Sequence, residues 1–165
     1  MFICYLYIFY IISLSFFLEV MILGNYILDT NVIIKLWNKE EFNDILQENE
    51  IIIIDEIFKE LAKKERMLFN GELIMSERFM KLIPYRIELD NIMAENFIKE
   101  INFDHIKGEF YYYNGKKISK NDLLLIVALK EKVEFSLVTE DFNLTYIAKE
   151  LLGENRVLNI KDILM

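Results

Sequence analysis

The sequence predicts an α/β protein in which helices cover both faces of a central parallel sheet, giving three layers in the order α/β/α. Short apolar runs alternate along the chain with longer segments of helical periodicity, as expected where strands are separated by helices. The run of four isoleucines at residues 51–54 is β-branched and apolar throughout, which is typical of a strand buried on both faces.

Length and composition indicate one domain with a sizeable core. The chain has 165 residues, of which 54% are hydrophobic and 28% are charged, and this composition excludes a disordered protein. One proline and five glycines leave little material for a flexible linker. We therefore expect a single folded domain over residues 21–165, preceded by a distinct hydrophobic segment at residues 1–20.

The first half of this domain predicts two strands and three helical segments. Residues 26–28 and 50–54 are short and apolar, as buried strands are. Residues 32–37 and 40–47 have helical periodicity. A longer amphipathic helix is predicted at residues 55–68, with Ile57, Leu61 and Leu68 on or near one side.

The middle of the chain gives weaker signals. We expect a helical segment at residues 71–80 and an edge strand at residues 82–89, because Pro84 cannot donate a ladder hydrogen bond. A helix is predicted at residues 90–101, with apolar positions at Ile92, Ala94, Phe97, Ile98 and Ile101.

Residues 103–118 form the most irregular stretch. The Asn114-Gly115 pair is a tight-turn signal, so we expect a small hairpin with Tyr111–Tyr113 before the turn and Lys116-Lys117 after it. His105 is expected to be an exposed loop residue.

The end of the chain returns to clear periodicity. Helices are predicted at residues 119–131 and 142–152, and Gly153 ends the second of them. Buried strands are predicted at residues 135–139 and 156–160.

The first twenty residues have two interpretations. Residues 1–18 carry no charge, and the run is long enough for a transmembrane helix, but it lacks the basic start and cleavage site of a secretory signal. Alternatively, Met21 is the true start, since it leads directly into the first predicted strand. We favour a start at Met21 and a cytoplasmic protein, with a membrane anchor through residues 1–20 as the alternative.

The residue counts restrict the chemistry that the chain can support. One cysteine, Cys4, and one histidine, His105, exclude a disulfide framework and any zinc site built from Cys and His. A bound metal would therefore be held by oxygen, which favours Mg²⁺ or Mn²⁺. The net charge of −8 argues against a protein that coats nucleic acid by charge alone. It fits a protein in which a group of acids without basic partners binds a cation.

Four acids follow predicted strands or begin predicted helices. Asp29 and Asp141 lie at strand ends, and Glu60 and Asp122 lie in the first turns of helices. Because ligands bind beyond the carboxyl ends of parallel strands, all four can converge on one edge of the sheet. Carboxylates there would hold divalent cations, which activate water for phosphodiester hydrolysis.

Each of these acids also has a purely structural interpretation. Ser119 and Asp122 fit a capping box, and Asp141 fits an N-cap. Asp29 could begin a turn, and Glu60 could be a solvated helix charge. Asn31 and Thr139 are candidates to orient carboxylates or water, with buried or capping roles as the alternative.

Four short motifs resemble, in order, those of the PIN-domain ribonucleases, and together they span residues 26 to about 160. They are Tyr26-Ile27-Leu28-Asp29-Thr30-Asn31-Val32, Lys59-Glu60-Leu61, Asn121-Asp122 before an aliphatic–alanine helix, and Leu137-Val138-Thr139-Glu140-Asp141. The resemblance implies a PIN-like fold with Asp29, Glu60, Asp122 and Asp141 as catalytic metal ligands. One departure is Asp55-Glu56, where the family has a small residue or proline, so Glu56 competes with Glu60 as the helix-borne ligand.

The same resemblance implies a function and partners. It indicates an endoribonuclease that depends on Mg²⁺ or Mn²⁺, specifically the VapC-type toxin of a toxin–antitoxin pair. Its partners would be an RNA substrate, a small antitoxin protein and a second copy of the chain in a homodimer. Lys116, Lys117 and Lys120 with Tyr111–Tyr113 could contact this RNA, or could form a solvated hairpin.

Two other functions compete with this one. A non-catalytic PIN-like binding or interaction module would keep the fold and use the same edge for a partner. A haloacid-dehalogenase-like phosphatase also begins with a strand and an Asp, but it needs a second Asp where this chain has Asn31. The chain has no Gly-rich phosphate loop that would support nucleotide binding.

Overall fold

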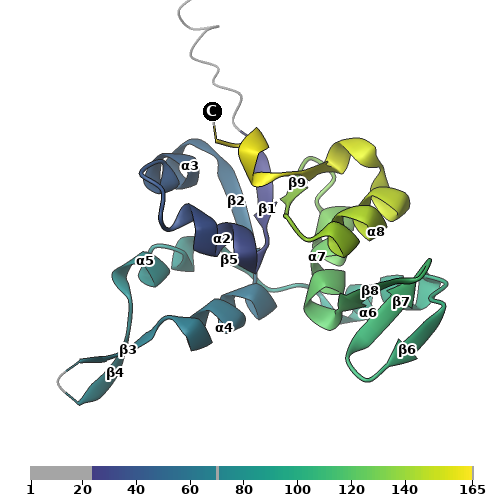
Figure 1. Ribbon diagram of the computed structural model, residues 1–165, viewed down its shortest axis with the longest axis horizontal. Helices are drawn as coiled ribbons and strands as arrows, with labels where there is room; N and C mark the ends of the chain where they lie inside the picture. The colour runs from purple at the N-terminus through teal and green to yellow at the C-terminus, as the bar shows by residue number, and fades with distance from the viewer. Residues whose placement is uncertain (1–23, 70, 165) are drawn as a thin grey trace, which may run out of the picture.

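The computed structural model describes residues 24–69 and 71–164, and its centre is a five-stranded parallel sheet (Figure 1). The strands lie in the order β10–β9–β1–β2–β5, and each neighbouring pair is parallel. Their bounds are Val157–Leu158 for β10, Ser136–Val138 for β9, Asn25–Leu28 for β1, Glu50–Ile54 for β2 and Arg86–Ile87 for β5.

Helices cover both faces of the sheet, which confirms the three-layer α/β/α prediction (Figure 1). On one side lie α2 (Thr30–Leu36), α3 (Phe42–Glu48), α4 (Asp55–Lys64) and the short α5 (Glu77–Met80). On the other side lie α6 (Asn91–Glu100), α7 (Lys120–Glu131) and α8 (Phe142–Leu152). The crossovers between parallel strands are right-handed, so the direction in which the chain moves along the sheet decides which face a connecting helix covers. The chain moves in one direction from β1 through β2 to β5 and in the opposite direction to reach β9 and β10, so the two sets of helices cover opposite faces.

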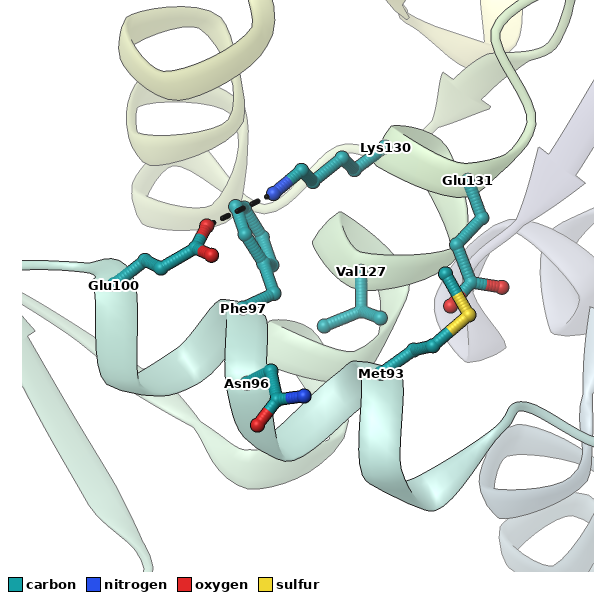
Figure 2. A pocket seen from close by; sticks show the side chains of 7 residues that line it. All are labelled: Met93, Asn96, Phe97, Glu100, Val127, Lys130 and Glu131. Atoms are coloured by element: carbon teal, nitrogen blue, oxygen red, sulfur yellow. Dashed lines mark hydrogen bonds and ion pairs between the residues drawn. The ribbon is translucent and has the colours of Figure 1, made fainter.

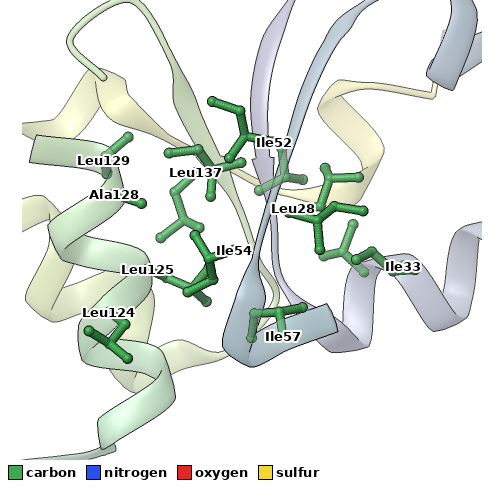
Figure 3. Packing of buried hydrophobic residues seen from close by; sticks show 14 of the residues in the cluster. Leu28, Ile33, Ile52, Ile54, Ile57, Leu124, Leu125, Ala128, Leu129 and Leu137 are labelled. Carbon is green, nitrogen blue, oxygen red and sulfur yellow. The ribbon is translucent and has the colours of Figure 1, made fainter. Parts of the chain in front are cut away.

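Apolar side chains fill both spaces between sheet and helices. In Figure 3, Ile33 and Ile57 lie on one side of the strands, and Leu124, Leu125, Ala128 and Leu129 of α7 lie on the other. Seven consecutive residues of α7, from Leu123 to Leu129, are buried, because this helix packs against the sheet as well as α6 and α8. A helix that is apolar on all sides is stable only when it is enclosed in this way.

The strand order reverses beside β1. β1 pairs with β2 on one side, where Ile27 is opposite Ile52, and with β9 on the other, where Leu28 is opposite Val138. The connections from β1 and from β9 therefore leave the sheet towards opposite faces. In open α/β sheets, such a reversal opens a crevice at the carboxyl ends of the two strands, and ligands bind there.

Two antiparallel units lie outside the central sheet. β3 (Arg66–Phe69) and β4 (Glu72–Met75) form a hairpin, and β6 (His105–Lys107), β7 (Phe110–Tyr113) and β8 (Lys116–Ser119) form a three-stranded meander. The expected Asn114-Gly115 turn joins β7 to β8, with positive φ values of 47° and 70°. The described part of the chain also contains three single-turn 3₁₀ helices: η1 (Ile83–Tyr85), η2 (Glu154–Arg156) and η3 (Ile160–Asp162).

Two helix predictions before residue 81 were wrong. α4 ends at Lys64, and Leu68 lies in β3 with 74% of its surface exposed. Residues 72–75 form β4, so the helix predicted at 71–80 is reduced to α5. A hairpin replaces these helical segments because of the contacts of the buried Glu65. Its carboxylate accepts hydrogen bonds from Arg78 Nε and Nη2 at 2.7 Å each and from Ser76 Oγ at 2.5 Å. These bonds close the base of the β3–β4 hairpin, and Gly71 at φ 85° makes its turn.

Three smaller predictions also need correction. Ile92 is 72% exposed and does not contribute to the core of α6. His105 is exposed as expected, but it lies in strand β6 and its ring stacks on Tyr112. The irregular stretch contains one strand more than the predicted hairpin, because β6 adds to its outer side.

The edge strand predicted at residues 82–89 is reduced to β5, because Pro84 lies in the 3₁₀ helix η1 before it. The other predicted elements of the domain are present. The predictions for residues 1–20 lie outside the described residues. Among the helices that the structure describes, none is long and apolar enough to cross a membrane.

Candidate carboxylate site

The candidate site begins where β1 and β9 end. Asp29 follows β1 directly, and only 5% of its surface is exposed. Its Oδ2 atom accepts a hydrogen bond of 2.8 Å from the hydroxyl of Thr139, which follows β9. The Thr139 oxygen in turn accepts a bond of 3.1 Å from the backbone N–H of Asp141. Thr139 therefore positions both acids at the point where the strand order reverses.

Asp29 is a buried acid in an unfavourable environment for its charge. The pKa of Asp29 is raised to about 6, mainly by burial; the hydrogen bond from Thr139 lowers the pKa, and the charges of Asp122 and Asp141 raise it. Two other acids are buried, Asp55 and Glu65, and both are ion-paired to lysine or arginine. Among the described residues, Asp29 is the buried acid without such a partner.

Asp122 occupies the third position of α7 and closes a complete capping box. Its Oδ2 atom accepts from both the backbone N–H and the hydroxyl of Ser119, at 2.8 Å each, and its own N–H donates to the Ser119 hydroxyl. Burial raises the pKa of Asp122 despite these bonds, and the charges of Asp141 and Glu60 raise it further. The capping interpretation of Asp122 is therefore correct, and the same carboxylate also interacts with two other candidate acids.

Asp141 is the N-cap of α8. Its Oδ1 atom accepts a bond of 2.7 Å from the backbone N–H of Leu144. Asp122 and Asp141 each use one carboxylate oxygen for capping, and the described residues offer no hydrogen bond to the second oxygen. A cap and a ligand role are compatible for both residues, because the two roles need different oxygens.

Glu60, rather than Glu56, is connected to the Asp29 segment. The hydroxyl of Thr30, a buried residue next to Asp29, donates to Glu60 Oε2 at 3.1 Å. Glu60 Oε1 accepts from Lys64 Nζ at 2.9 Å, so a lysine partly neutralises this acid. The first turn of α4 contains Glu56, and Glu60 lies one turn later, not in the first turn as predicted. Glu56 lines a hollow between α4, α6 and the start of α7 together with Lys120 and Asn121.

The four predicted acids thus form one electrostatically coupled set, but not a preassembled metal centre. The charges of Asp122 and Asp141 both raise the pKa of Asp29, and the charges of Asp141 and Glu60 both raise the pKa of Asp122. Within residues 24–69 and 71–164, no three acid, histidine or cysteine side chains are gathered closely enough to hold a metal ion. The donor chemistry nevertheless suits a hard divalent cation, since every candidate ligand is a carboxylate and the buried Asp29 is not ion-paired.

Several contacts at this edge were not predicted from the sequence. The motif around Asp29 contains Thr30, but nothing in the sequence indicates that its hydroxyl reaches Glu60 across thirty residues. Lys35 of α2 forms an ion pair with Glu140, which joins α2 to the loop between Thr139 and Asp141. Asn31, expected to orient a carboxylate or water, is exposed and makes no side-chain hydrogen bond to another described residue.

A separate hollow between α6 and α7 does not belong to this site. It has a volume of about 280 Å³, and Figure 2 shows Met93, Phe97 and Val127 among its lining residues. Lys130 spans one end, with its Nζ atom 3.2 Å from Glu100 Oε2 and 3.9 Å from the centre of the Phe97 ring. None of the four candidate acids lines this hollow.

Comparisons with protein-family models, with curated proteins and with solved structures find no match to this chain. The interpretation of the site therefore depends on its geometry and on the motifs in the sequence.

Proposed function

We propose that this protein is a divalent-metal-dependent endoribonuclease that uses Mg²⁺ or Mn²⁺. The observation that carries the proposal is Asp29, a buried carboxylate at the point where the strand order reverses, with no lysine or arginine partner among the residues that the structure describes. A buried charge without a partner is strongly unfavourable, and a bound cation would remove that penalty. The charges of Asp122 and Asp141 act on the same carboxylate, which supports a shared cation.

Each residue has a distinct part in the proposed site. Asp29, Glu60, Asp122 and Asp141 would hold the metal, which supplies an activated water and neutralises charge on the phosphodiester. Thr139 fixes the orientation of Asp29, and Thr30 fixes that of Glu60. Lys64 Nζ donates to Glu60 Oε1, so a bound cation would compete with Lys64 for the Glu60 carboxylate.

The resemblance to PIN-domain ribonucleases supports a more specific role. We propose that the chain is the VapC-type toxin of a toxin–antitoxin pair, with a small antitoxin that covers the site and a second copy that forms a homodimer. This part of the proposal depends on the sequence motifs alone. If expression of the chain in growing cells changes neither growth nor RNA integrity, the toxin role is wrong even if the protein cleaves RNA in vitro.

A non-catalytic binding module is the second candidate. Three observations favour it: Asp122 and Asp141 are both caps, Glu60 is paired with Lys64, and no group of three acids is preassembled among the described residues. Such a module would keep the charged edge for a protein or nucleotide partner without turning over a substrate.

Metal-dependent cleavage of RNA separates these functions. The full chain is incubated with an end-labelled single-stranded RNA oligomer in Mg²⁺, in Mn²⁺ or in EDTA, and with a small phosphate monoester in parallel. The nuclease proposal predicts internal cleavage of RNA with either metal, none in EDTA and no hydrolysis of the monoester. Asp29→Asn should abolish cleavage, whereas Asp90→Asn, the same change at the N-cap of α6, should not. Intact RNA under all conditions would favour the binding module.

A further inference from the structure

The meander β6–β7–β8 presents an ordered outer face. Residues directly opposite each other in antiparallel strands point to the same side, so the register places six side chains on one face in two rows. One row is His105–Tyr112–Lys117, and the other is Lys107–Phe110–Ser119.

Aromatic rings and cations on this face are already in contact. The His105 and Tyr112 rings stack with their centres 4.0 Å apart. Lys117 Nζ lies 3.6 Å from the centre of the Phe110 ring. His105, Lys107, Phe110 and Lys117 are all exposed, so these groups are accessible to a ligand.

The opposite face of the meander accounts for the remaining tyrosines. Tyr111 lies between Ile106 and Ile118 in the register, and its ring centre is 5.0 Å from that of Phe103. Tyr111 and Tyr113 both pack against the core. Of the three consecutive tyrosines that were candidates for RNA contact, only Tyr112 therefore belongs to the outer face.

The charge of this segment is opposite to that of the whole protein. The net charge of the chain is −8, but residues 105–120 contain four lysines and a single acid, Glu109. Asp104, just before the meander, accepts a hydrogen bond of 2.8 Å from the Gly115 N–H at the β7–β8 turn. A local excess of positive charge on an acidic protein is suited to a polyanion.

The outer face leads directly to the candidate carboxylate site. Ser119, the last residue of one row, donates two hydrogen bonds to Asp122. The backbone carbonyl of Lys117 accepts a bond of 3.1 Å from Asn143 Nδ2, two residues beyond Asp141. A chain lying across the outer face would therefore reach Asp122 and Asp141 at its end.

We infer that the outer face of the meander is a platform for single-stranded RNA, with bases stacking on Tyr112 and Phe110 and with Lys107 and Lys117 pairing with phosphates. This inference rests on the proposed ribonuclease function for its choice of RNA. Stacking on side chains requires bases that are not stacked in a duplex, which is why the platform selects single strands. Lys107 and Lys117 supply a local positive charge on a protein whose net charge is −8.

The test measures binding without cleavage. Fluorescence anisotropy gives the Kd of the full chain for a labelled oligouridylate in EDTA, with a duplex RNA of the same length in parallel. Phe110→Ala and Tyr112→Ala should each raise the Kd for the single strand by about fivefold or more, because each removes one stacking surface. Tyr112→Phe should keep the affinity, since stacking needs the ring and not the hydroxyl.

The lysines provide a second readout that does not depend on folding of the meander. Lys117 is exposed, so Lys117→Gln should fold normally, weaken binding and reduce the dependence of log Kd on log salt by about one phosphate contact. Lys39→Gln, the same change at an exposed lysine between α2 and α3, is the matched control and should leave both quantities unchanged. Circular dichroism confirms that each variant is folded.

The outcomes for the platform and for the nuclease are distinguishable. Loss of affinity in the meander variants supports the platform even if the protein never cleaves RNA with metal, in which case the proposed function fails alone. The platform is overturned if the unmodified chain does not bind the single strand, if it binds the duplex equally well, or if Phe110→Ala, Tyr112→Ala and Lys117→Gln all bind like the unmodified chain. Cleavage of RNA in that last case would leave the nuclease proposal intact.

Discussion

The hydroxyl of Thr139 donates a hydrogen bond of 2.8 Å to Asp29, and this contact joins the ends of two neighbouring parallel strands. Both residues are almost fully buried, at 2% and 5% exposure. The bond is the main favourable interaction that lowers the proton affinity of Asp29, against burial and the charges of Asp122 and Asp141. It therefore decides how readily Asp29 carries the negative charge that a metal ligand needs.

The first prediction removes this bond. Thr139→Val keeps the shape of the side chain and deletes the hydroxyl, so the pKa of Asp29 should rise above about 6. At pH 8, where Asp29 is ionised, urea unfolding should show a loss of roughly 1.5–3 kcal/mol, the usual worth of a hydrogen bond to a charged group. The loss should be smaller at pH 5, where Asp29 is mostly protonated. Thr139→Ser retains a hydroxyl and should restore most of the stability; an equal loss for both variants at both pH values would contradict this role.

The second prediction concerns the pH dependence of stability without metal. The pKa of Asp29 in the folded protein, about 6, lies above its ordinary value of 3.8, so the folded state binds the proton more tightly than the unfolded state. Tighter proton binding by the folded state stabilises the protein by roughly 3 kcal/mol at most. This stabilisation is fully present below pH 3.8 and is lost as the pH rises through 6. Asp29→Asn lacks this titration. The stability of Asp29→Asn relative to the unmodified chain should therefore increase between pH 4 and pH 7 in chelator, and a constant difference would argue against the raised pKa.

The third prediction tests the link between Thr30 and Glu60. Thr30→Val removes the donor that holds Glu60 Oε2, so Glu60 should turn more readily to solvent and Lys64. If Glu60 is a ligand, loss of such a positioning contact should lower the rate of RNA cleavage by about tenfold. Thr30→Ser keeps the donor and should cleave at nearly the normal rate. Equal rates for Thr30→Val and the unmodified chain would remove Glu60 from the site.

The fourth prediction separates structural acids from site acids. Asp55 follows β2 at the same edge of the sheet, but its carboxylate pairs with Lys59 and with Arg86 Nη2, the latter at 2.5 Å. Burial alone would raise the pKa of Asp55, and the hydrogen bond from Lys59 and the charge of Arg86 lower it overall. Asp55→Asn should lower the free energy of unfolding by about 1–2 kcal/mol, because it breaks both ion pairs. The loss is moderate because Lys59 and Arg86 are partly solvated. RNA cleavage under conditions where the variant is folded should be unaffected; loss of cleavage there would place Asp55 in the site.

The sequence predicted the parts of the fold that are coded locally. The isoleucine run at residues 51–54 and the apolar stretch from Leu123 to Leu129 indicate a strand and a helix by composition alone, and both are buried. The Asn114-Gly115 turn and the stop at Gly153 are equally local signals. In contrast, the β3–β4 hairpin depends on the contact of Glu65 with Arg78, thirteen residues apart, and no local pattern reveals it.

The candidate site was predictable to a similar extent. Asp29 and Asp141 follow strands, so their common edge followed from the rule for parallel sheets, and the capping alternatives for Asp122 and Asp141 were also visible in the sequence. The contacts of the two helix-borne acids were not visible in the sequence. In the structure, the Thr30 hydroxyl donates to Glu60, whereas Glu56 lines the hollow beside Lys120. The stacked pair His105–Tyr112 likewise depends on a strand, β6, that was expected to be a loop.

The central claim is that Asp29 and Asp141 belong to one cation site, and the shift of the melting temperature with Mn²⁺ tests it most directly. Asp141→Asn removes the charge but keeps an N-cap, since Asn caps helices as well as Asp does. Asp90→Asn makes the same change at the N-cap of α6 and serves as the control. Mn²⁺ that binds the folded protein stabilises it by mass action and so raises its melting temperature. We predict a clear increase in melting temperature with Mn²⁺ for the unmodified chain and for Asp90→Asn, and little or none for Asp141→Asn. An equal increase in all three proteins, or none in the unmodified chain, would contradict a metal site at this edge of the sheet.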